Sequence, residues 1–534
     1  MAAAALTATD AARFLTQATF GPTPDEITAL TGKTAAALDQ WITSQMAVPM
    51  SSHDAATDAD FITYSKPAGN AQLTQNNRQA AWWKVSVDGP DQLRQRVAFA
   101  LSQIFVVSEN NAVLTNQPSA LAFYYDLLAK NAFGNFRTLI EDVTLSPAMG
   151  IYLSHLRNPK GTYNAQGVQT SFPDENYARE VMQLFTIGIN QLHPDGTLKL
   201  DPTGAPIPTY DQKTISEVAK VFTGWSYAST AATPNFMGGA ANYLRPMQAY
   251  AAFHDVSTKT VVGGRVLPAN QTAQKDLADT LDALFQHPNT GVFIGRQLIQ
   301  RLVTSNPSPG YVYRVGRVFA DNGNGIRGDM GAVVRAILMD YEARSPQMLE
   351  SASFGKLREP VLRTTALLRA LGAGSNSGRV PYLAGQTDAS LAQTPLRAPT
   401  VFNFFEPDYV QPGLLAGAGL YAPEYQILND TTAMTVPNFL WNQIYANRAA
   451  ATDTDNQTVG VRFDAAMLTL ANTPAALVDR LSVNLAAGAL PKATTDRIVQ
   501  AITAMPATND ATRLERVRSA AYLIVSSPAG AIQK

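Results

Sequence analysis

The segment PDQLRQRVAFALSQIFVV, residues 90–107, decides the fold class. Its apolar residues recur at steps of three and four, which is the spacing of an amphipathic helix, and Pro90-Asp91 is a typical helix start. The same spacing recurs in segments spread along the chain, at 120–133, 214–225, 272–287, 328–344 and 356–373. No series of alternating strands accompanies them. The sequence therefore predicts a mainly α fold, a large single helical domain with long irregular loops and at most minor β-structure.

Four stretches rich in Ser, Asp, Asn, Gly or Pro interrupt this helical pattern, and we interpret them as loop insertions. They are residues 49–75, 157–172, 193–210 and 226–270. A weak break at AATDTDNQ, residues 450–457, precedes a last helical stretch. We therefore expect a helical core domain over residues 1–450 and a C-terminal helical segment over 451–534 that packs on the same core.

Composition limits the classes of function. With 534 residues, 46% of them hydrophobic and 16% charged, the chain can bury a large core. A net charge of −1 provides no electrostatic footprint for nucleic acid, so we expect no nucleic-acid partner. The lack of cysteine excludes disulfides, thiolate catalysis and cysteine-bound zinc. No apolar stretch approaches the roughly 20 residues of a transmembrane helix, and no signal peptide is visible in this chain.

A second segment, SFPDENYAREVMQLFTIGIN at 171–190, places a carboxylate at the edge of an apolar helix face. At about 100° per residue, Glu180 lies about 60° from Tyr177, beside the apolar stripe. A carboxylate there is either paired in a salt bridge or has a raised pKa, so a structural and a catalytic role both stay open. Asp174 and Glu175 are expected in the first helical turn, where the helix dipole favours anions.

The pair His254-Asp255 is another candidate for chemistry. The carboxylate can orient the imidazole or join it on a metal, and the alternative is a hydrogen-bonded pair that fixes a loop. No HExxH or HxH motif is present, so no metal ligand is assigned. DNGNGIRGD at 321–329 has oxygen donors typical of a calcium loop but lacks the closing glutamate of an EF-hand, and a tight turn before a helix is the alternative. We expect no cofactor, with a calcium or other divalent ion as the alternative.

Aromatic residues indicate a carbohydrate-binding groove. Trp82-Trp83, Trp225 and the loop VFNFFEPDY at 401–409 provide rings on which sugars can stack, with carboxylates between them. Core packing is the alternative use of the same rings. The residues expected to bind substrate are Tyr177, Trp225, Asn403, Phe405 and Glu406.

Several motifs resemble a large bacterial family called domain of unknown function 1800. The resemblance rests first on NYAREVMQLFTIGI at 176–189 and TYDQKTISEVAKVFTGW at 209–225, then on FHDVSTKTVVGG at 253–264. Further matching motifs, from AARFLTQATFGPT at 11–23 to AAYLIVSSPA at 520–529, extend it over almost the whole chain. The resemblance implies an exported bacterial protein, periplasmic, secreted or at the cell surface. It also implies a sulfatase-like partner protein encoded nearby.

Three functions remain as expectations. The first is an exported polysaccharide-active hydrolase or lyase that uses carboxylate general acid/base catalysis in an aromatic-lined cleft. The second is a metal-assisted enzyme that uses His254 and Asp255, and the third is a non-catalytic cell-surface or assembly protein. The catalytic residues are expected among Glu180, Glu175, Asp174, His254 and Asp255, with Glu217 and Glu406 as further candidates for the second carboxylate.

Overall fold

The computed structural model describes residues 5–232, 235–374, 387–445 and 460–534, and helices make up 55% of the structure. The predicted mainly α fold is confirmed. Within these ranges, named strands occur only as four two-stranded antiparallel pairs, so the β-structure is minor as expected. None of the described helices combines the length and the apolar character that a membrane span requires.

The chain divides into two compact units, and we describe each by itself. Unit 1 contains Met1–Ala100, Ile299–Pro307 and Ile337–Lys534, and unit 2 contains Leu101–Leu298 and Ser308–Ala336. Three helices contain residues of both units: α6 (Gln92–Ser102), α13 (Pro288–Leu302) and α15 (Met330–Met339). The predicted boundary at residue 450 lies outside the described residues, so the division into 1–450 and 451–534 stays a prediction.

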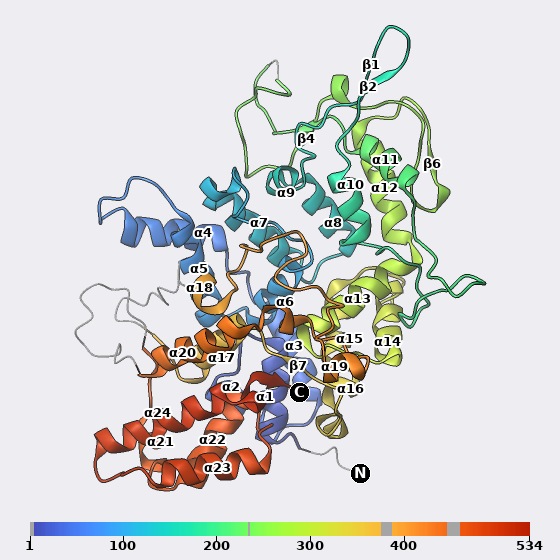
Figure 1. The fold of residues 1–534 in the computed structure, drawn as a ribbon. Coiled ribbons are helices and arrows are strands. Elements are labelled where there is room, and N and C mark those ends of the chain that lie inside the picture. Colours follow the sequence, from blue (N-terminus) through green and yellow to red (C-terminus); the bar gives the residue numbers. More distant parts are fainter. Residues whose placement is uncertain (1–4, 233–234, 375–386, 446–459) are drawn as a thin grey trace. The chain divides into compact units, whose positions relative to one another are not determined.

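Unit 1 combines the N-terminal helices with the C-terminal third of the chain, and most of its α-helices are labelled in Figure 1. Its first elements are α1 (Ala8–Ala18), α2 (Pro24–Leu30), α3 (Ala36–Ala47), α4 (His53–Asp60), the π-helical η1 (Phe61–Ser65) and α5 (Gln75–Asp88). The later ones are α16 (Tyr341–Arg344), η5 (Pro346–Leu349), β7 (Lys356–Leu357), α17 (Pro360–Ala370), α18 (Thr387–Leu391), α19 (Leu414–Gly417), η6 (Pro423–Ile427), α20 (Asp430–Tyr445), α21 (Ala465–Leu470), α22 (Pro474–Ala486), α23 (Lys492–Thr503), α24 (Asp510–Ser526), α25 (Pro528–Ala531) and β8 (Ile532–Gln533).

The predicted loop at 49–75 contains α4 and η1, so part of it is helical. The Ser52 side chain caps α4 by accepting a hydrogen bond from Ala55 N. The buried Asp60 accepts a hydrogen bond from Asn77 of α5, at 2.9 Å. The polar composition of this stretch therefore serves a helix cap and a helix contact, which composition alone does not reveal.

Arg369 of α17 joins three distant segments of unit 1. Its guanidinium donates to the carbonyls of Gly21 and Val87 and pairs with Glu26 at 3.0 Å. The same helix packs directly on the chain at Gly21, because a Cβ there would lie 2.3 Å from the Cα of Ala366. Burial lowers the pKa of Arg369, and the nearby Glu26 carboxylate partly restores it.

Unit 2 contains the segments that hold the predicted catalytic residues. Its helices are η2 (Leu114–Asn116), α7 (Pro118–Lys130), α8 (Phe136–Leu145), α9 (Pro147–Tyr152), α10 (Asn176–Gln183), α11 (Gln212–Val221), η3 (Ala251–Phe253), η4 (Val262–Gly264), α12 (Ala273–Gln286) and α14 (Pro309–Ala320). Its strands pair as β1 (Thr162–Tyr163) with β2 (Gln169–Ser171), β3 (Trp225–Ser226) with β4 (Gln248–Ala249), and β5 (Lys259–Thr260) with β6 (Val266–Leu267).

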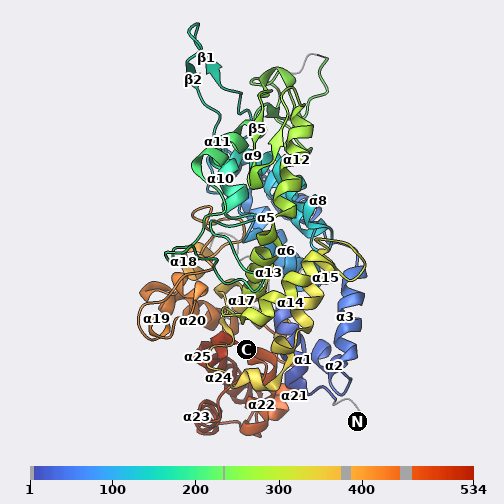
Figure 2. The same ribbon diagram turned by 90° about the vertical axis from the view of Figure 1, so that its right-hand side faces the viewer.

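Helix α11 has several neighbours in unit 2. Helix α11 contacts α10, α12 and β5, and Figure 2 shows α10 and α11 side by side. The β1–β2 hairpin extends away from these helices in both views (Figures 1 and 2). The segment at 321–329 is a tight turn before α15, in which Asp321 Oδ1 accepts hydrogen bonds from Gly323 N and Gly325 N.

The contact between Gly21 and α17 leads to a stability prediction. Gly21→Ala should lower the free energy of unfolding by roughly 3 kcal/mol, because the backbone has a φ of +124° and the new methyl group collides with Ala366. Gly32→Ala is the matched control, since Gly32 also has a positive φ but nothing lies within 4 Å of its Cβ position. The control should lose only about 1 kcal/mol in urea unfolding. Equal losses would contradict the close contact.

Candidate functional site

Glu180 lies on α10 and is 6% exposed. Its Oε2 atom is buried, and no hydrogen-bond partner for it exists among the described residues. The nearest arginine in sequence, Arg179, turns instead to Glu175, with 3.6 Å between Arg179 Nη2 and Glu175 Oε2. Burial raises the pKa of Glu180 above its ordinary value, and the charge of Arg179 lowers it by less. Glu180 is thus a buried carboxylate that forms no salt bridge with any of the described residues.

Two tyrosines border Glu180, and both are half-buried. Burial raises the pKa of Tyr152, at the end of α9, to about 12, and the negative charge of Glu180 adds to this shift. The pKa of Tyr210, just before α11, is raised by the same two causes in the same order. Both phenols are therefore neutral hydrogen-bond donors at neutral pH, next to a carboxyl group whose pKa is raised by burial.

Tyr177 fixes α10 one turn before Glu180. A hydrogen bond of 2.7 Å joins its hydroxyl to Thr144 Oγ1 at the end of α8. The ring of His155 stacks on that of Tyr177, with 3.9 Å between the centroids. Phe222 contacts the Tyr177 ring edge-on at 4.8 Å. The side chain predicted to bind substrate is therefore part of the core, where it holds the helix that carries Glu180.

His155 is a buried neutral histidine that the sequence did not single out. Its Nε2 lies 2.8 Å from the carbonyl oxygen of Thr144 and donates to it. Its Nδ1 is buried and has no hydrogen-bond partner among the described residues. Burial lowers its pKa to about 4, although the bond to Thr144 acts in the opposite direction. The only available signal was its position near the end of a helix, which does not distinguish packing from chemistry.

Asp174 and Glu175 precede α10 instead of forming its first turn. Asp174 is exposed, and its Oδ1 accepts a hydrogen bond from Asn176 N at 2.8 Å. Glu175 Oε1 accepts from Ser216 Oγ at 2.6 Å, and Oε2 accepts from Gln212 Nε2 at 2.8 Å. The two carboxylates lie one and two residues before α10 and not in its first turn, as was expected, and a local turn and α11 supply their hydrogen-bond donors. Glu175 thereby joins α10 to α11.

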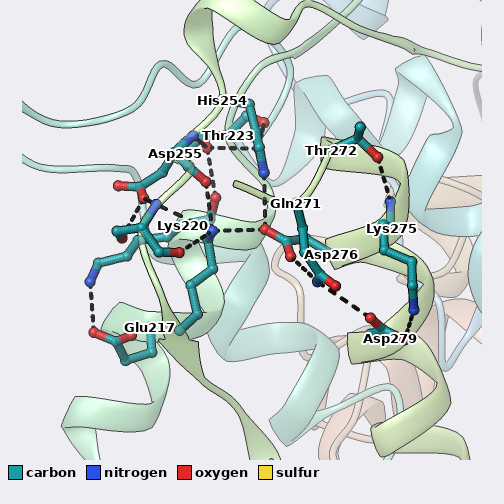
Figure 3. Close-up of polar contacts among 12 residues, drawn as sticks. Glu217, Lys220, Thr223, His254, Asp255, Gln271, Thr272, Lys275, Asp276 and Asp279 are labelled. Atoms are coloured by element: carbon teal, nitrogen blue, oxygen red, sulfur yellow. Dashed lines mark hydrogen bonds and ion pairs between the residues drawn. The ribbon is translucent and has the colours of Figure 1, made fainter. Parts of the chain in front are cut away.

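His254 and its neighbours form a second buried cluster in unit 2 (Figure 3). His254 Nδ1 lies 3.0 Å from the carbonyl of Thr223, and Nε2 lies 3.0 Å from Asp276 Oδ2. Both ring nitrogens therefore face hydrogen-bond acceptors, one a carbonyl and the other a carboxylate. Gly224, with a φ of +79°, allows the approach, since a Cβ there would lie 2.8 Å from His254 N.

Lys259 completes the cluster. Its Nζ lies 2.7 Å from Asp276 Oδ2 and donates to the carbonyls of Asp255 and Ser257 at 2.6 and 2.9 Å. Burial raises the pKa of Asp276, but hydrogen bonds from His254, Lys259 and Gln271 outweigh this and lower it below its ordinary value. The exposed fractions are 1% for Lys259 and 0% for Asp276, so the ion pair is withdrawn from water.

The contacts of this cluster match the loop-fixing role that the sequence left open for His254 and Asp255. Asp255 Oδ1 accepts from Ser257 N and its backbone N donates to Thr223 Oγ1, so it closes a turn. Both nitrogens of His254 are already bonded, and a metal would have to displace one partner. Among the described residues, no group of three or more histidine, aspartate and glutamate side chains is placed to hold a metal ion. The metal-assisted alternative stays untested.

The remaining predicted residues are mostly buried. Trp225 is 3% exposed on β3 in unit 2, and its indole nitrogen has no hydrogen-bond partner among the described residues. In unit 1, Asn403 and Phe405 are 5% and 3% exposed, while Glu406 is exposed. Trp82 and Trp83 form an edge-to-face pair in the interior of unit 1, at 5.3 Å. Packing accounts for these rings, and the aromatic-lined cleft stays a prediction.

Unit 1 also has a cavity of about 240 Å³ beside Lys356. The ammonium of Lys356 donates to the carbonyls of Gln300 and Arg301 and pairs with Glu424 at 2.8 Å. Burial raises the pKa of Glu424, and Lys356 lowers it by less. Because these contacts satisfy the ammonium, Lys356 serves the interior of unit 1 more than a ligand in the cavity.

The match to a family model spans residues 13–530, nearly the whole chain, and the family is described as "Protein of unknown function (DUF1800)". The chain belongs to the DUF1800 family. No curated protein and no solved structure matches it. Two of the motifs that carry the family resemblance, at 176–189 and 209–225, hold Glu180 and Tyr210, and a third, at 253–264, holds His254 and Lys259.

The buried ion pair leads to a prediction for Asp276→Asn. This change keeps the shape but removes the nearest counter-charge of the buried Lys259 ammonium and leaves only Asp255 Oδ1, at 3.9 Å. The free energy of unfolding should therefore fall by roughly 3 kcal/mol at neutral pH. Because the pKa of Asp276 is lowered in the folded state, its contribution is present above the ordinary value of 3.8. It should be lost as the pH falls below 3.8 through the folded-state pKa, so wild type and variant should converge there.

Asp279→Asn is the matched control, one turn further along α12. Its partners Arg265 and Lys275 are 44% and 58% exposed, so water replaces the lost pair and the cost should be about 1 kcal/mol or less. Urea unfolding across a pH series measures both variants. An equal, pH-independent loss in both would contradict the buried-charge account.

Glu180→Gln should behave in the opposite way. A raised pKa means that the folded state disfavours the charged form, so the carboxylate lowers stability at neutral pH and the amide should leave stability unchanged or increased. The difference in stability between the variant and the wild type should stop changing as the pH falls below the ordinary value of 4.5, because the Glu180 carboxyl group is then protonated in both the folded and the unfolded state. Glu175→Gln, which loses the pair with Arg179, should instead lose up to about 1 kcal/mol. A loss of roughly 3 kcal/mol for Glu180→Gln would reveal a structural role.

Proposed function

We propose that the chain is an exported polysaccharide-active enzyme, a hydrolase or a lyase, in which Glu180 transfers the proton. The observation that carries the proposal is the buried Oε2 atom of Glu180, which lacks a hydrogen-bond partner among the described residues. A carboxylate kept without a partner lowers stability, and sites of chemistry are where proteins accept such a cost. Its raised pKa is the property that a general acid needs near neutral pH.

The neighbours of Glu180 provide groups for both reaction types. In hydrolysis, the protonated Glu180 donates to the glycosidic oxygen as the C–O bond breaks, while a second carboxylate takes a proton from the attacking water. Glu175, at the junction of α10 and α11, is the first candidate for this carboxylate, and Asp174 and Glu217 are the other candidates in unit 2. Glu217 is already paired with Lys220 at 2.7 Å.

In elimination, a base removes the proton next to the carboxylate of a uronic acid, and the glycosidic oxygen leaves with a proton from an acid. Glu180 would be the base when it is ionised. The neutral hydroxyl of Tyr152 or Tyr210 would be the acid. Two observations support elimination. The tyrosines that border Glu180 can supply the acid, and among the described residues of unit 2 only Glu180 is a buried carboxylate with an unbonded oxygen, so a second such carboxylate for hydrolysis is not at hand.

We infer that the enzyme acts on its polysaccharide substrate outside the cytoplasm, which agrees with the resemblance to exported bacterial proteins. The sulfatase-like partner rests on that resemblance alone. It fits the same proposal, because sulfated polysaccharides need both ester and glycosidic cleavage. Cell fractionation with an antibody against the chain tests the location, and a purely cytoplasmic signal would contradict it.

The enzymatic proposal predicts the effect of Glu180→Gln on activity. On a panel of neutral and acidic polysaccharides, the wild type should release new reducing ends from at least one polymer, and the variant should lose roughly 100-fold or more in rate with its fold intact. Asp201→Asn is the control, since Asp201 is not a candidate and its side chain only closes a turn in unit 2, where it accepts hydrogen bonds from Thr203 N and Ala205 N. Ultraviolet absorbance of an unsaturated product distinguishes a lyase from a hydrolase. No cleavage of any polymer, or full activity in the variant, would favour a non-catalytic protein instead.

A further inference from the structure

Helix α20 of unit 1 carries an exposed aromatic pair that the site around Glu180 does not use. Trp441 is 45% exposed, and its ring stacks on that of Tyr445 one turn later, with 4.9 Å between the centroids and 14° between the planes. The other face of α20 is buried through residues such as Val436, Phe439 and Leu440. The tryptophan is therefore outside the packing of the helix while its orientation is fixed.

The contacts of Tyr445 hold this pair in place. A hydrogen bond of 2.9 Å joins its hydroxyl to Ser519 Oγ on α24. Tyr522 meets its ring edge-on at 6.4 Å, and the guanidinium of Arg518 lies 6.0 Å from the ring centroid. Because the stack is already ordered, a ligand that covers Trp441 loses little conformational entropy of the protein.

Amide side chains border the aromatic pair. At about 100° per residue, Asn438 lies about 60° and Asn442 about 100° from Trp441 around the helix, on the same side as Tyr445. Both asparagines are exposed. Arg518 is paired with Glu515 at 2.7 Å, so the surface has no net charge from this pair. The surface thus combines a flat π face with neutral hydrogen-bonding groups at its side.

We propose that Trp441, Tyr445, Asn438 and Asn442 form a binding platform for a neutral polysaccharide, separate from the chemistry of Glu180. A pyranose ring presents C–H groups to a π face and directs its hydroxyls outwards, where amides donate and accept hydrogen bonds. The proposal takes only the class of polysaccharides from the proposed function; the neutral character of the ligand follows from the neutral groups of this surface, and the platform has its own residues and variants.

The size of the surface favours a sugar over a protein partner. A fully covered aromatic side chain contributes at most about 250 Å², whereas a stable protein interface buries about 800 Å² on each partner. Trp441 and Met434 are only 45% and 66% exposed, so each offers part of its side-chain surface to a ligand. One or two sugar rings match this surface.

Affinity electrophoresis tests the platform with gels that contain hydroxyethyl cellulose, xyloglucan, mixed-linkage β-glucan or galactomannan. At least one of these neutral polymers should retard the wild type, and Trp441→Ala should weaken the apparent affinity about tenfold or more, with Trp441→Phe between them. Tyr163→Ala is the matched control, since it removes a 58% exposed aromatic ring in unit 2 and should bind as the wild type does. Thermal unfolding checks that each variant keeps its fold.

A second readout uses the exposure of Trp441 itself. Trp82, Trp83 and Trp225 are at most 3% exposed and Trp41 is half-buried, so Trp441 is the most exposed of the five tryptophans. Acrylamide should quench its fluorescence most, the retarding polymer should reduce that quenching, and Trp441→Phe should lack this change. Glu180→Gln should bind the polymer as the wild type does, whether or not it loses activity. The binding result therefore tests the platform alone, and the activity result tests the enzymatic proposal alone. Three outcomes would overturn the platform: no neutral polymer retards the wild type, Trp441→Ala binds unchanged, or size-exclusion chromatography shows that Trp441→Ala dissociates a dimer.

Discussion

A carboxylate withdrawn from water needs hydrogen-bond donors, and in unit 2 Asp276 imposes this requirement on the chain around it. The donors are His254, Lys259 and Gln271, which all precede α12 in a stretch with few residues in strands. Each bond fixes a different point of that stretch on α12. An insertion whose composition is typical of a flexible loop thereby acquires a defined path, and Thr223 connects it to the end of α11.

Glu180 is the counterpart of Asp276 in the same unit. Both carboxylates are buried, but donors surround one, and an oxygen of the other has no partner among the described residues. The pKa of Asp276 is lowered and that of Glu180 is raised, which follows from the same burial with and without compensating hydrogen bonds. This contrast is the reason that chemistry is proposed for Glu180, whereas the contacts of the His254 cluster fix a loop.

The aromatic residues divide in a similar way. Tyr177, Trp225, Trp82 and Trp83 have 1–3% of their surface exposed, and their value to the protein is packing. Trp441 is ordered by a stacked neighbour and nonetheless 45% exposed, a state in which its apolar surface contributes little to folding. An ordered aromatic side chain that stays exposed can bind a ligand. Carbohydrate binding is therefore proposed for Trp441, which lies outside the aromatic motifs from which the sequence predicted a groove.

The sequence by itself determined what depends on neighbours along the chain. The helical class follows from apolar spacing within single segments, and the position of Glu180 at the edge of an apolar face follows from the geometry of one helix. Only the tertiary structure decided which buried polar groups have partners: Asp276 lies 22 residues beyond His254, and Ser216 lies 41 residues beyond Glu175. It also decided that Trp82, Trp83 and Trp225 are interior while Trp441 is not. The physical reason is that desolvation and hydrogen-bond compensation depend on atoms that folding brings together from distant positions, and a local pattern does not contain them.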